Sequence, residues 1–113
     1  MTALENETTQ IEIIEFQMGK HILKLSLDPE KSFLPNKTTQ QFPEAVKIPP
    51  NSKVIDLGSG VGPIAIWAAM EEPTSQIYAV EIVPEQYRFL VDNIRTNGLS
   101  DRIFPYCGSL YAP

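Results

Sequence analysis

A glycine-rich loop between a short strand and a buried helix constrains this chain more than any other feature of its sequence. Residues 53–57 are mostly aliphatic and predict a strand. They run directly into Gly58-Ser59-Gly60-Val61-Gly62. Pro63 follows at a place that suits the first position of a helix, where the missing N–H is not needed. A strand, a tight loop and a helix in this order predict the opening unit of a parallel α/β sheet.

Strands and helices keep alternating after this loop. Residues 63–71 are apolar nearly all round, which predicts a helix that is buried on several sides. Residues 76–80 predict a second strand, which ends on Glu81. Residues 102–107 predict a third strand, although Pro105 cannot donate a hydrogen bond to a sheet. The expected fold class is therefore α/β, with the first three strands of a Rossmann-like parallel sheet.

The helix between the second and third strands has the clearest amphipathic pattern in the chain. Its apolar residues recur at helical spacing on one face, and they are Tyr87, Leu90, Val91 and Ile94. Gly98 suits the left-handed position just beyond a helix, and Leu99 can then fold back onto Ile94. Charged residues occupy the other face and predict that it is exposed to solvent.

The part of the chain before the glycine-rich loop has a different organisation. Residues 11–16 and 21–27 predict two strands joined by a turn at Gly19, which together form a β-hairpin. Five prolines fall within residues 28–52 and predict mostly connector, with room for one short helix. The domains expected are a disordered lead-in (1–10), the hairpin and Pro-rich connector (11–52), and the partial Rossmann-like domain (53–113).

Length and charge exclude several classes of protein. A chain of 113 residues has room for one domain. Its net charge is −5 and its nine basic residues are scattered, which disfavours a surface that binds nucleic acid. Nothing in the sequence indicates DNA as a partner. The first ten residues contain no lysine or arginine, so we expect no secretory signal. The longest apolar run, residues 63–70, is too short for a membrane span, and we expect a cytoplasmic location. One cysteine and one histidine predict neither a disulfide nor a metal site.

The loop also predicts a class of ligand. Glycines let a backbone approach a ligand closely, and Glu81, which lies 19 residues beyond Gly62, can accept hydrogen bonds from both hydroxyls of a ribose. A dinucleotide fingerprint requires a glycine at the sixth position from Gly58, where this chain has Pro63. Asp56 precedes the loop and suits a ligand without phosphates that carries a cationic amino-acid end.

These motifs resemble those of class I S-adenosylmethionine-dependent methyltransferases. Residues 56–62 are similar to the first motif of that family, and residues 80–85 are similar to the second. Residues 93–103 resemble the passage from helix to third strand in the subgroup that modifies ribosomal components, RNA or release-factor glutamine. The resemblance covers residues 53–110 and implies the cofactor-binding part of a methyltransferase with a protein or RNA acceptor.

The resemblance also implies roles for individual residues toward S-adenosyl-L-methionine. The loop would contact the methionine and ribose parts, Asp56 would meet the amino group, Glu81 would hold the ribose diol, and Ile82 would pack against the adenine. Ser109 stands where the family usually has an acidic residue for the adenine amino group, and a serine accepts that bond more weakly. Val83 replaces the polar helix cap expected before Pro84. The predicted cofactor-binding residues are Asp56, Gly58, Ser59, Gly60, Gly62, Glu81, Ile82 and Ser109.

Two other functions remain open at this point. The chain could be a non-catalytic module that binds S-adenosylmethionine, or no ligand, and acts through a partner. It could also be a fragment of a nicotinamide-dependent oxidoreductase, which Pro63 disfavours. No catalytic residue is predicted, because the family's acceptor-gripping motif is not found in these 113 residues. A three-stranded sheet with open edges predicts that the isolated chain is oligomeric, loosely folded or missing a C-terminal half.

Overall fold

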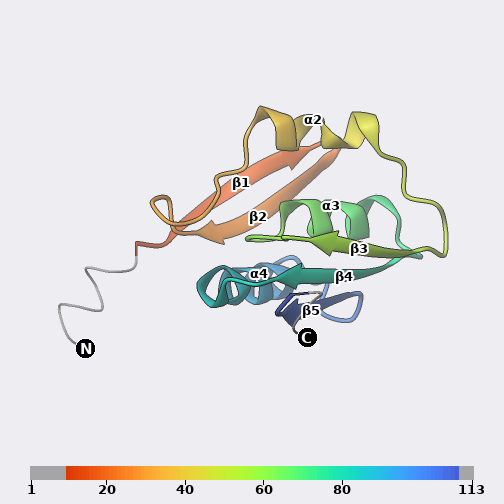
Figure 1. The fold of residues 1–113 in the computed structure, drawn as a ribbon. Coiled ribbons are helices and arrows are strands. Elements are labelled where there is room, and N and C mark those ends of the chain that lie inside the picture. Colours follow the sequence, from red (N-terminus) through yellow and green to blue (C-terminus); the bar gives the residue numbers. More distant parts are fainter. Residues whose placement is uncertain (1–9, 110–113) are drawn as a thin grey trace.

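The computed structural model describes residues 10–109 and has two sheets (Figure 1). Strands β1 and β2 form an antiparallel hairpin, and β3, β4 and β5 form a parallel sheet in that order. The predicted α/β fold, with a hairpin before a partial Rossmann-like sheet, is confirmed. The elements are β1 (Glu12–Met18), β2 (His21–Leu27), α2 (Lys37–Ala45), β3 (Lys53–Leu57), α3 (Pro63–Glu71), β4 (Gln76–Glu81), α4 (Pro84–Thr96) and β5 (Ile103–Cys107).

The hairpin covers one side of the helical layer. Strand β1 runs two residues further than predicted, to Met18, because the turn takes only Gly19 and Lys20 before the pairing of Met18 with His21. The inner face of the hairpin is buried and packs on α3 and α4. Helix α3 is buried all round at its centre, as its apolar sequence predicts. The core therefore lies between the hairpin and the parallel sheet, with α3 and α4 inside it.

The buried face of α4 includes the predicted Leu90 and Ile94, with Tyr87 packed against the core, but it also contains polar residues. Tyr87 and Val91 are only half-buried, whereas Gln86 and Asn93 are buried beside Leu90. Asn93 accepts a hydrogen bond from the Ser26 N–H (2.7 Å) and donates to the carbonyls of Ser26 (3.0 Å) and Val61 (2.8 Å). This polar side chain is buried because its amide pairs with the backbone at the edge of β2.

Asn97 repeats the arrangement one turn later on α4. Its Oδ1 accepts from the Lys24 N–H (3.0 Å), and its Nδ2 donates to the Lys24 carbonyl (2.8 Å). Backbone groups on the open edge of a strand need partners, and here two side-chain amides take the place of a neighbouring strand. The predicted end of the helix is confirmed, since Gly98 donates to the Arg95 carbonyl and Leu99 to the Ile94 carbonyl.

Asn97→Ala is expected to lower the free energy of unfolding by about 1–2 kcal/mol, since it leaves both polar groups of Lys24 without their amide partner. The expected fall in Tm is roughly 4–15 °C for a domain of this size. Arg95→Ala, on the exposed side of α4, is the matched control and should change Tm little. Equal Tm values for the two variants would contradict the edge-pairing role of Asn97.

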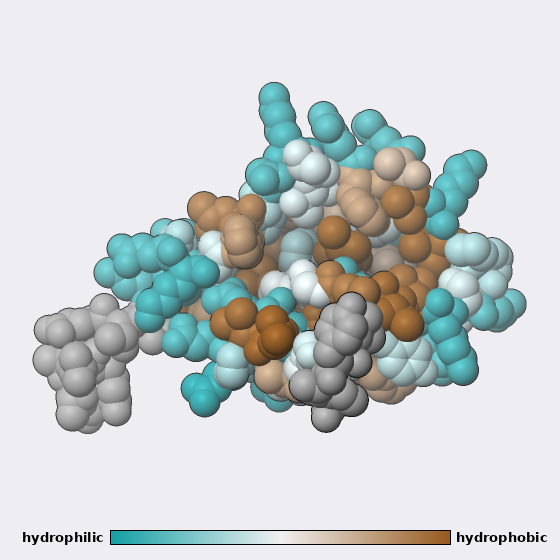
Figure 2. All heavy atoms as spheres, viewed as in Figure 1, coloured by the Kyte–Doolittle hydropathy of each residue, from teal (hydrophilic) through white to brown (hydrophobic). Residues whose placement is uncertain are grey.

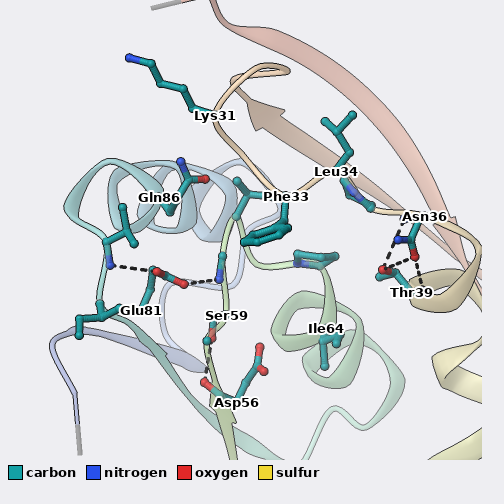
Figure 3. Close-up of a pocket in the computed structure, with 17 residues that line it drawn as sticks. Lys31, Phe33, Leu34, Asn36, Thr39, Asp56, Ser59, Ile64, Glu81 and Gln86 are labelled. Carbon is teal, nitrogen blue, oxygen red and sulfur yellow. Dashed lines mark hydrogen bonds between the residues drawn. The ribbon is translucent and has the colours of Figure 1, made fainter.

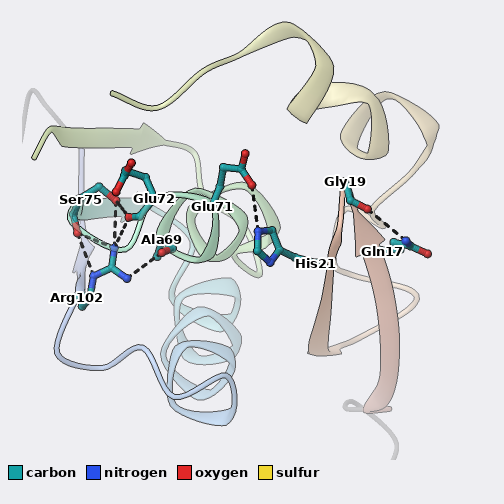
Figure 4. Close-up of polar contacts among 8 residues, drawn as sticks. All are labelled: Gln17, Gly19, His21, Ala69, Glu71, Glu72, Ser75 and Arg102. Atoms are coloured by element: carbon teal, nitrogen blue, oxygen red, sulfur yellow. Dashed lines mark hydrogen bonds and ion pairs between the residues drawn. The ribbon is translucent and has the colours of Figure 1, made fainter. Parts of the chain in front are cut away.

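The side chains of Arg102 and His21 make polar contacts that join the ends of these elements (Figure 4). The Arg102 guanidinium donates to the carbonyls of Ala69 (2.8 Å), Glu72 (2.8 Å) and Ser75, which ties the end of α3 to the start of β5. His21, expected to be a strand side chain, begins β2, and its Nε2 lies 3.0 Å from Glu71 on α3. These contacts fix the hairpin and the parallel sheet onto opposite sides of α3.

Within residues 10–109, one face of the parallel sheet carries exposed apolar side chains. Its exposed side chains come from the two outer strands, and they are Ile55, Leu57, Phe104 and Tyr106. Figure 2 views this side, where hydrophobic side chains gather over β3 and β4. An apolar face of this kind favours association. Oligomerisation or loose folding of the isolated chain therefore stays a prediction.

No helix within residues 10–109 is both long and apolar enough to cross a membrane.

Candidate ligand-binding site

A cavity of about 540 Å³ opens at the carboxyl ends of β3 and β4. Its walls are the loop after β3, the passage from β4 to α4, and the segment before α2 (Figure 3). Six of the eight predicted residues line it, which are Asp56, Gly58, Ser59, Gly60, Glu81 and Ile82. Gly62 and Ser109 are not among the lining residues in the described part of the chain. Parallel α/β sheets bind ligands at this end of their strands.

Backbone hydrogen bonds tie the start of the glycine-rich loop to the end of β4. The N–H groups of Gly58 and Ser59 both donate to the Val80 carbonyl at 2.9 Å. The Ser59 hydroxyl donates to the Asp56 carbonyl at 2.9 Å. Gly58 and Gly60 have φ values of 71° and 59°, and a Cβ at either position would meet nothing within 4 Å. The loop therefore requires glycine for its conformation and leaves free space above it for a ligand.

Gly62 serves packing in this structure. It caps α3 with φ at 103°, and a Cβ there would lie 2.8 Å from Leu90 Cδ1. The missing side chain therefore lets the start of α3 lie against Leu90 of α4. Ligand contact by Gly62, expected from the resemblance, gains no support from this placement.

Glu81 joins the two loops that border the cavity. Its side chain is only 7% exposed, and its Oε1 accepts from the Gly60 N–H at 2.7 Å. Its Oε2 accepts from the Val83 N–H at 2.9 Å. Each carboxylate oxygen can accept a further hydrogen bond. Glu81 can therefore shape the loop and still bind a pair of hydroxyl groups.

Asp56 has a buried oxygen that lacks a partner. Its Oδ2 makes no hydrogen bond within residues 10–109, although the carboxyl lines the cavity. Burial raises the pKa of Asp56, hydrogen bonding from Ser59 and Ala65 opposes the rise, and the nearby charge of Glu81 adds to it. Buried carboxylates in proteins are normally paired or hydrogen-bonded. The site therefore fits a ligand that brings a cationic donor to Asp56.

The wall opposite the glycine-rich loop is formed by residues outside the eight predicted ones. One part of this wall comes from the connector, just before and at the start of α2. The residues that line the cavity there are Phe33, Leu34, Pro35, Asn36 and Thr39. Asn36 caps α2 by accepting from the Thr39 N–H at 3.1 Å, which confirms a short helix in the connector. Gln86 lines the same wall from the first turn of α4. None of these residues belongs to a periodic motif, so their spacing carried no signal. Val83 provides no side-chain cap for α4, as predicted.

Comparisons with known proteins agree with this geometry. The TRM5/TYW2 methyltransferase domain matches residues 19–110. The chain is 42% identical over 59 residues to the ribosomal protein L11 methyltransferase of Geobacter sp. (strain M21), covering 52% of this chain and 19% of that protein. It is 39% identical over 59 residues to a tRNA1(Val) (adenine(37)-N6)-methyltransferase of Actinobacillus pleuropneumoniae serotype 5b (strain L20), covering 51% of this chain and 25% of that protein. The chain thus spans a quarter or less of these two relatives.

A solved structure shares the fold over most of the described residues. TYW2 of P. horikoshii, in complex with MeSAdo, superposes with a TM-score of 0.69 at 26% sequence identity. The similarity covers 84% of this chain and 35% of that one.

Proposed function

This chain belongs to the TRM5/TYW2 methyltransferase family, and from that premise we propose that it binds S-adenosyl-L-methionine for methyl transfer to RNA. The family match confirms the resemblance to class I S-adenosylmethionine-dependent methyltransferases and the cofactor that it implies. The oxidoreductase alternative gains no support from the comparisons. A non-catalytic module that binds the cofactor is the other outcome that the experiments below distinguish.

The observation that carries the proposal is the unpaired oxygen of Asp56 in the same cavity as the anchored carboxylate of Glu81 (Figure 3). In this arrangement the Asp56 carboxylate would bind the ammonium group of the ligand. Glu81 would accept hydrogen bonds from the ribose diol. The open space above Gly58 and Gly60 would accommodate the part of the ligand that connects its ammonium group to its ribose. When bound, the cofactor supplies a methyl group on a sulfonium, and this site would fix its position for in-line transfer.

Ile82 and Ser109 have separate roles in the proposal. Ile82 is exposed at the rim of the cavity and offers an apolar surface for the adenine. Ser109 follows β5 at the end of the described residues and is not among the residues that line the cavity. In the proposal its hydroxyl contacts the adenine amino group at the edge of the site. We propose that residues 53–109 form the cofactor-binding unit, with the hairpin and connector of residues 11–52 as its cover, in a cytoplasmic protein.

RNA is the favoured acceptor because of the family and the relatives. A similar protein of Actinobacillus pleuropneumoniae is named for a position in tRNA, and the matched family includes a TYW2 structure with an adenosyl ligand. The net charge of −5 indicates that this segment serves the cofactor and does not itself provide a phosphate-binding surface. A protein acceptor is the alternative, since another relative is named for ribosomal protein L11.

Asp56→Asn is expected to lower the affinity for S-adenosylhomocysteine by about 10- to 100-fold, because it removes a charge-assisted bond to the ammonium group. Isothermal titration calorimetry of the 113-residue chain at neutral pH measures this effect. Affinity of the unchanged chain should also fall as the pH drops through the raised pKa of Asp56, and this dependence should vanish in Asp56→Asn.

The stability of Asp56→Asn separates a binding role from a structural one. A carboxyl whose pKa is raised by folding destabilises the fold when it is ionised, and this cost disappears as the pH falls toward the ordinary aspartate value. Asp56→Asn should therefore not lower the free energy of unfolding at neutral pH. Asp101→Asn, at an exposed position, is the matched control. Lower stability together with unchanged affinity would contradict the assigned role.

A further inference from the structure

Phe33 is the most conspicuous side chain that the proposed function leaves unexplained. Its ring is 95% exposed, more than any other large hydrophobic side chain in residues 10–109. It nevertheless lines the cavity together with Leu34, which is half-exposed. A large aromatic ring in water is unfavourable compared with a buried one, and binding sites commonly contain such rings. The position of Phe33 therefore suggests that a ligand covers it.

The segment that carries Phe33 is fixed at both ends. On one side, buried Asp28 accepts from the Glu30 N–H (2.9 Å) and from the Ser32 N–H (2.8 Å). The Ser32 hydroxyl in turn accepts from the Asp28 N–H (3.1 Å). On the other side, Asn36 caps α2. Phe33 is thus held at the rim of the cavity by a rigid turn and a helix cap, so ordering it on binding costs little entropy.

A second, independent feature lies on the same wall. Gln86 is 92% buried, lines the cavity from α4, and its side-chain oxygen has no hydrogen-bond partner among the described residues. Gln86 and Phe33 line the same cavity, and in Figure 3 Gln86 is drawn above Glu81. A buried polar atom without a partner is unfavourable unless a ligand or water satisfies it. The wall that faces the glycine-rich loop therefore presents an apolar ring, and it also contains a buried oxygen, of Gln86, that lacks a hydrogen-bond donor without a ligand.

We propose that Phe33 is a binding residue whose ring covers the ribose of the bound cofactor. This inference rests on the proposed function, in which Glu81 holds the diol from the opposite side. A ribose bound at Glu81 presents its other face to the wall formed by Phe33 and Gln86. The ring excludes water from the bonds to Glu81, and Gln86 lies where a polar group of the nucleoside reaches its unsatisfied amide. The methyl donor and its demethylated product share this ribose, so the contact serves both.

The test compares Phe33→Ala with Phe33→Leu in the 113-residue chain. Calorimetric affinities are measured for S-adenosylmethionine and for S-adenosylhomocysteine. Phe33→Ala should weaken both ligands equally, by about 10- to 30-fold, whereas Phe33→Leu keeps the apolar cover and should lose less than about 3-fold. Ile13→Ala, which removes an exposed apolar side chain on β1 outside the cavity, is the matched control and should bind as the unchanged chain does.

Structural readouts accompany the affinities. Nuclear Overhauser effects between the Phe33 ring and the ribose protons should appear in the complex. Unchanged affinity of Phe33→Ala for both ligands would overturn the inference, and so would a loss confined to S-adenosylmethionine, since that would place the ring at the sulfonium. Failure of the unchanged chain to bind either ligand would instead overturn the proposed function, so the two failures are distinguishable.

Discussion

Glu81→Gln is expected to reduce the affinity for S-adenosylhomocysteine by about 100-fold or more, because a buried, hydrogen-bonded carboxylate is lost from the centre of the site. The glutamine oxygen can still accept from the Gly60 N–H, but its NH₂ group then faces the Val83 N–H, so two donors meet. The ribose diol also loses one of its two acceptors. Calorimetry measures the affinity, and the same variant should show faster amide exchange at Gly60 and Val83.

The control for this variant keeps the same chemical change away from the cavity. Glu15→Gln alters an exposed carboxylate on β1 and should leave both affinity and amide exchange unchanged. Glu81→Asp shortens the side chain, so it should bind the ligand more weakly than the unchanged chain while retaining the charge. If Glu81→Gln bound S-adenosylhomocysteine as tightly as Glu15→Gln does, Glu81 would not hold the diol.

Gly62→Ala is expected to cost about 2–4 kcal/mol in the free energy of unfolding. Roughly 1 kcal/mol comes from placing a Cβ on a residue with φ at 103°, and about 1–3 kcal/mol comes from overpacking against Leu90 Cδ1. Urea titration followed by far-ultraviolet circular dichroism measures this loss. Ligand affinity should fall little at temperatures where the variant stays folded, because Gly62 does not line the cavity.

Two further variants isolate the cause. Gly98→Ala places a Cβ at φ +72° in open space, so it should cost only about 1 kcal/mol. Leu90→Val removes the methyl group that the new Cβ would meet, and the double variant should recover part of the overpacking cost. Equal losses for Gly62→Ala and Gly98→Ala would show that close packing against Leu90 does not explain the glycine at position 62.

Local patterns explain why most of the fold was predictable. The alternation of strands and helices, the turn at Gly19 and the helix end at Gly98 each depend on residues close together in sequence. The glycine-rich loop and Glu81 could also be recognised from local sequence, because each directly follows a strand, and the two strands are neighbours in the parallel sheet. Six of the eight predicted site residues accordingly line one cavity.

The parts that could not be predicted depend on contacts between distant segments. Asn93 is buried against Ser26, 67 positions earlier, and no helical pattern shows that a polar residue faces the core. A loop motif likewise gives no indication that a Cβ at position 62 would lie against Leu90 on α4. Phe33 belongs to a proline-rich connector, and only the folded chain brings it across from the glycine-rich loop.

A protein-observed NMR titration of the 113-residue chain with S-adenosylhomocysteine, with NAD as the control, tests the cofactor site most directly. We predict dispersed spectra in which shifts concentrate at Gly58, Ser59, Gly60 and Glu81, and no such shifts with NAD. Dispersed spectra that ignore S-adenosylhomocysteine, or that respond equally to NAD at these residues, would contradict the proposed cofactor-binding function.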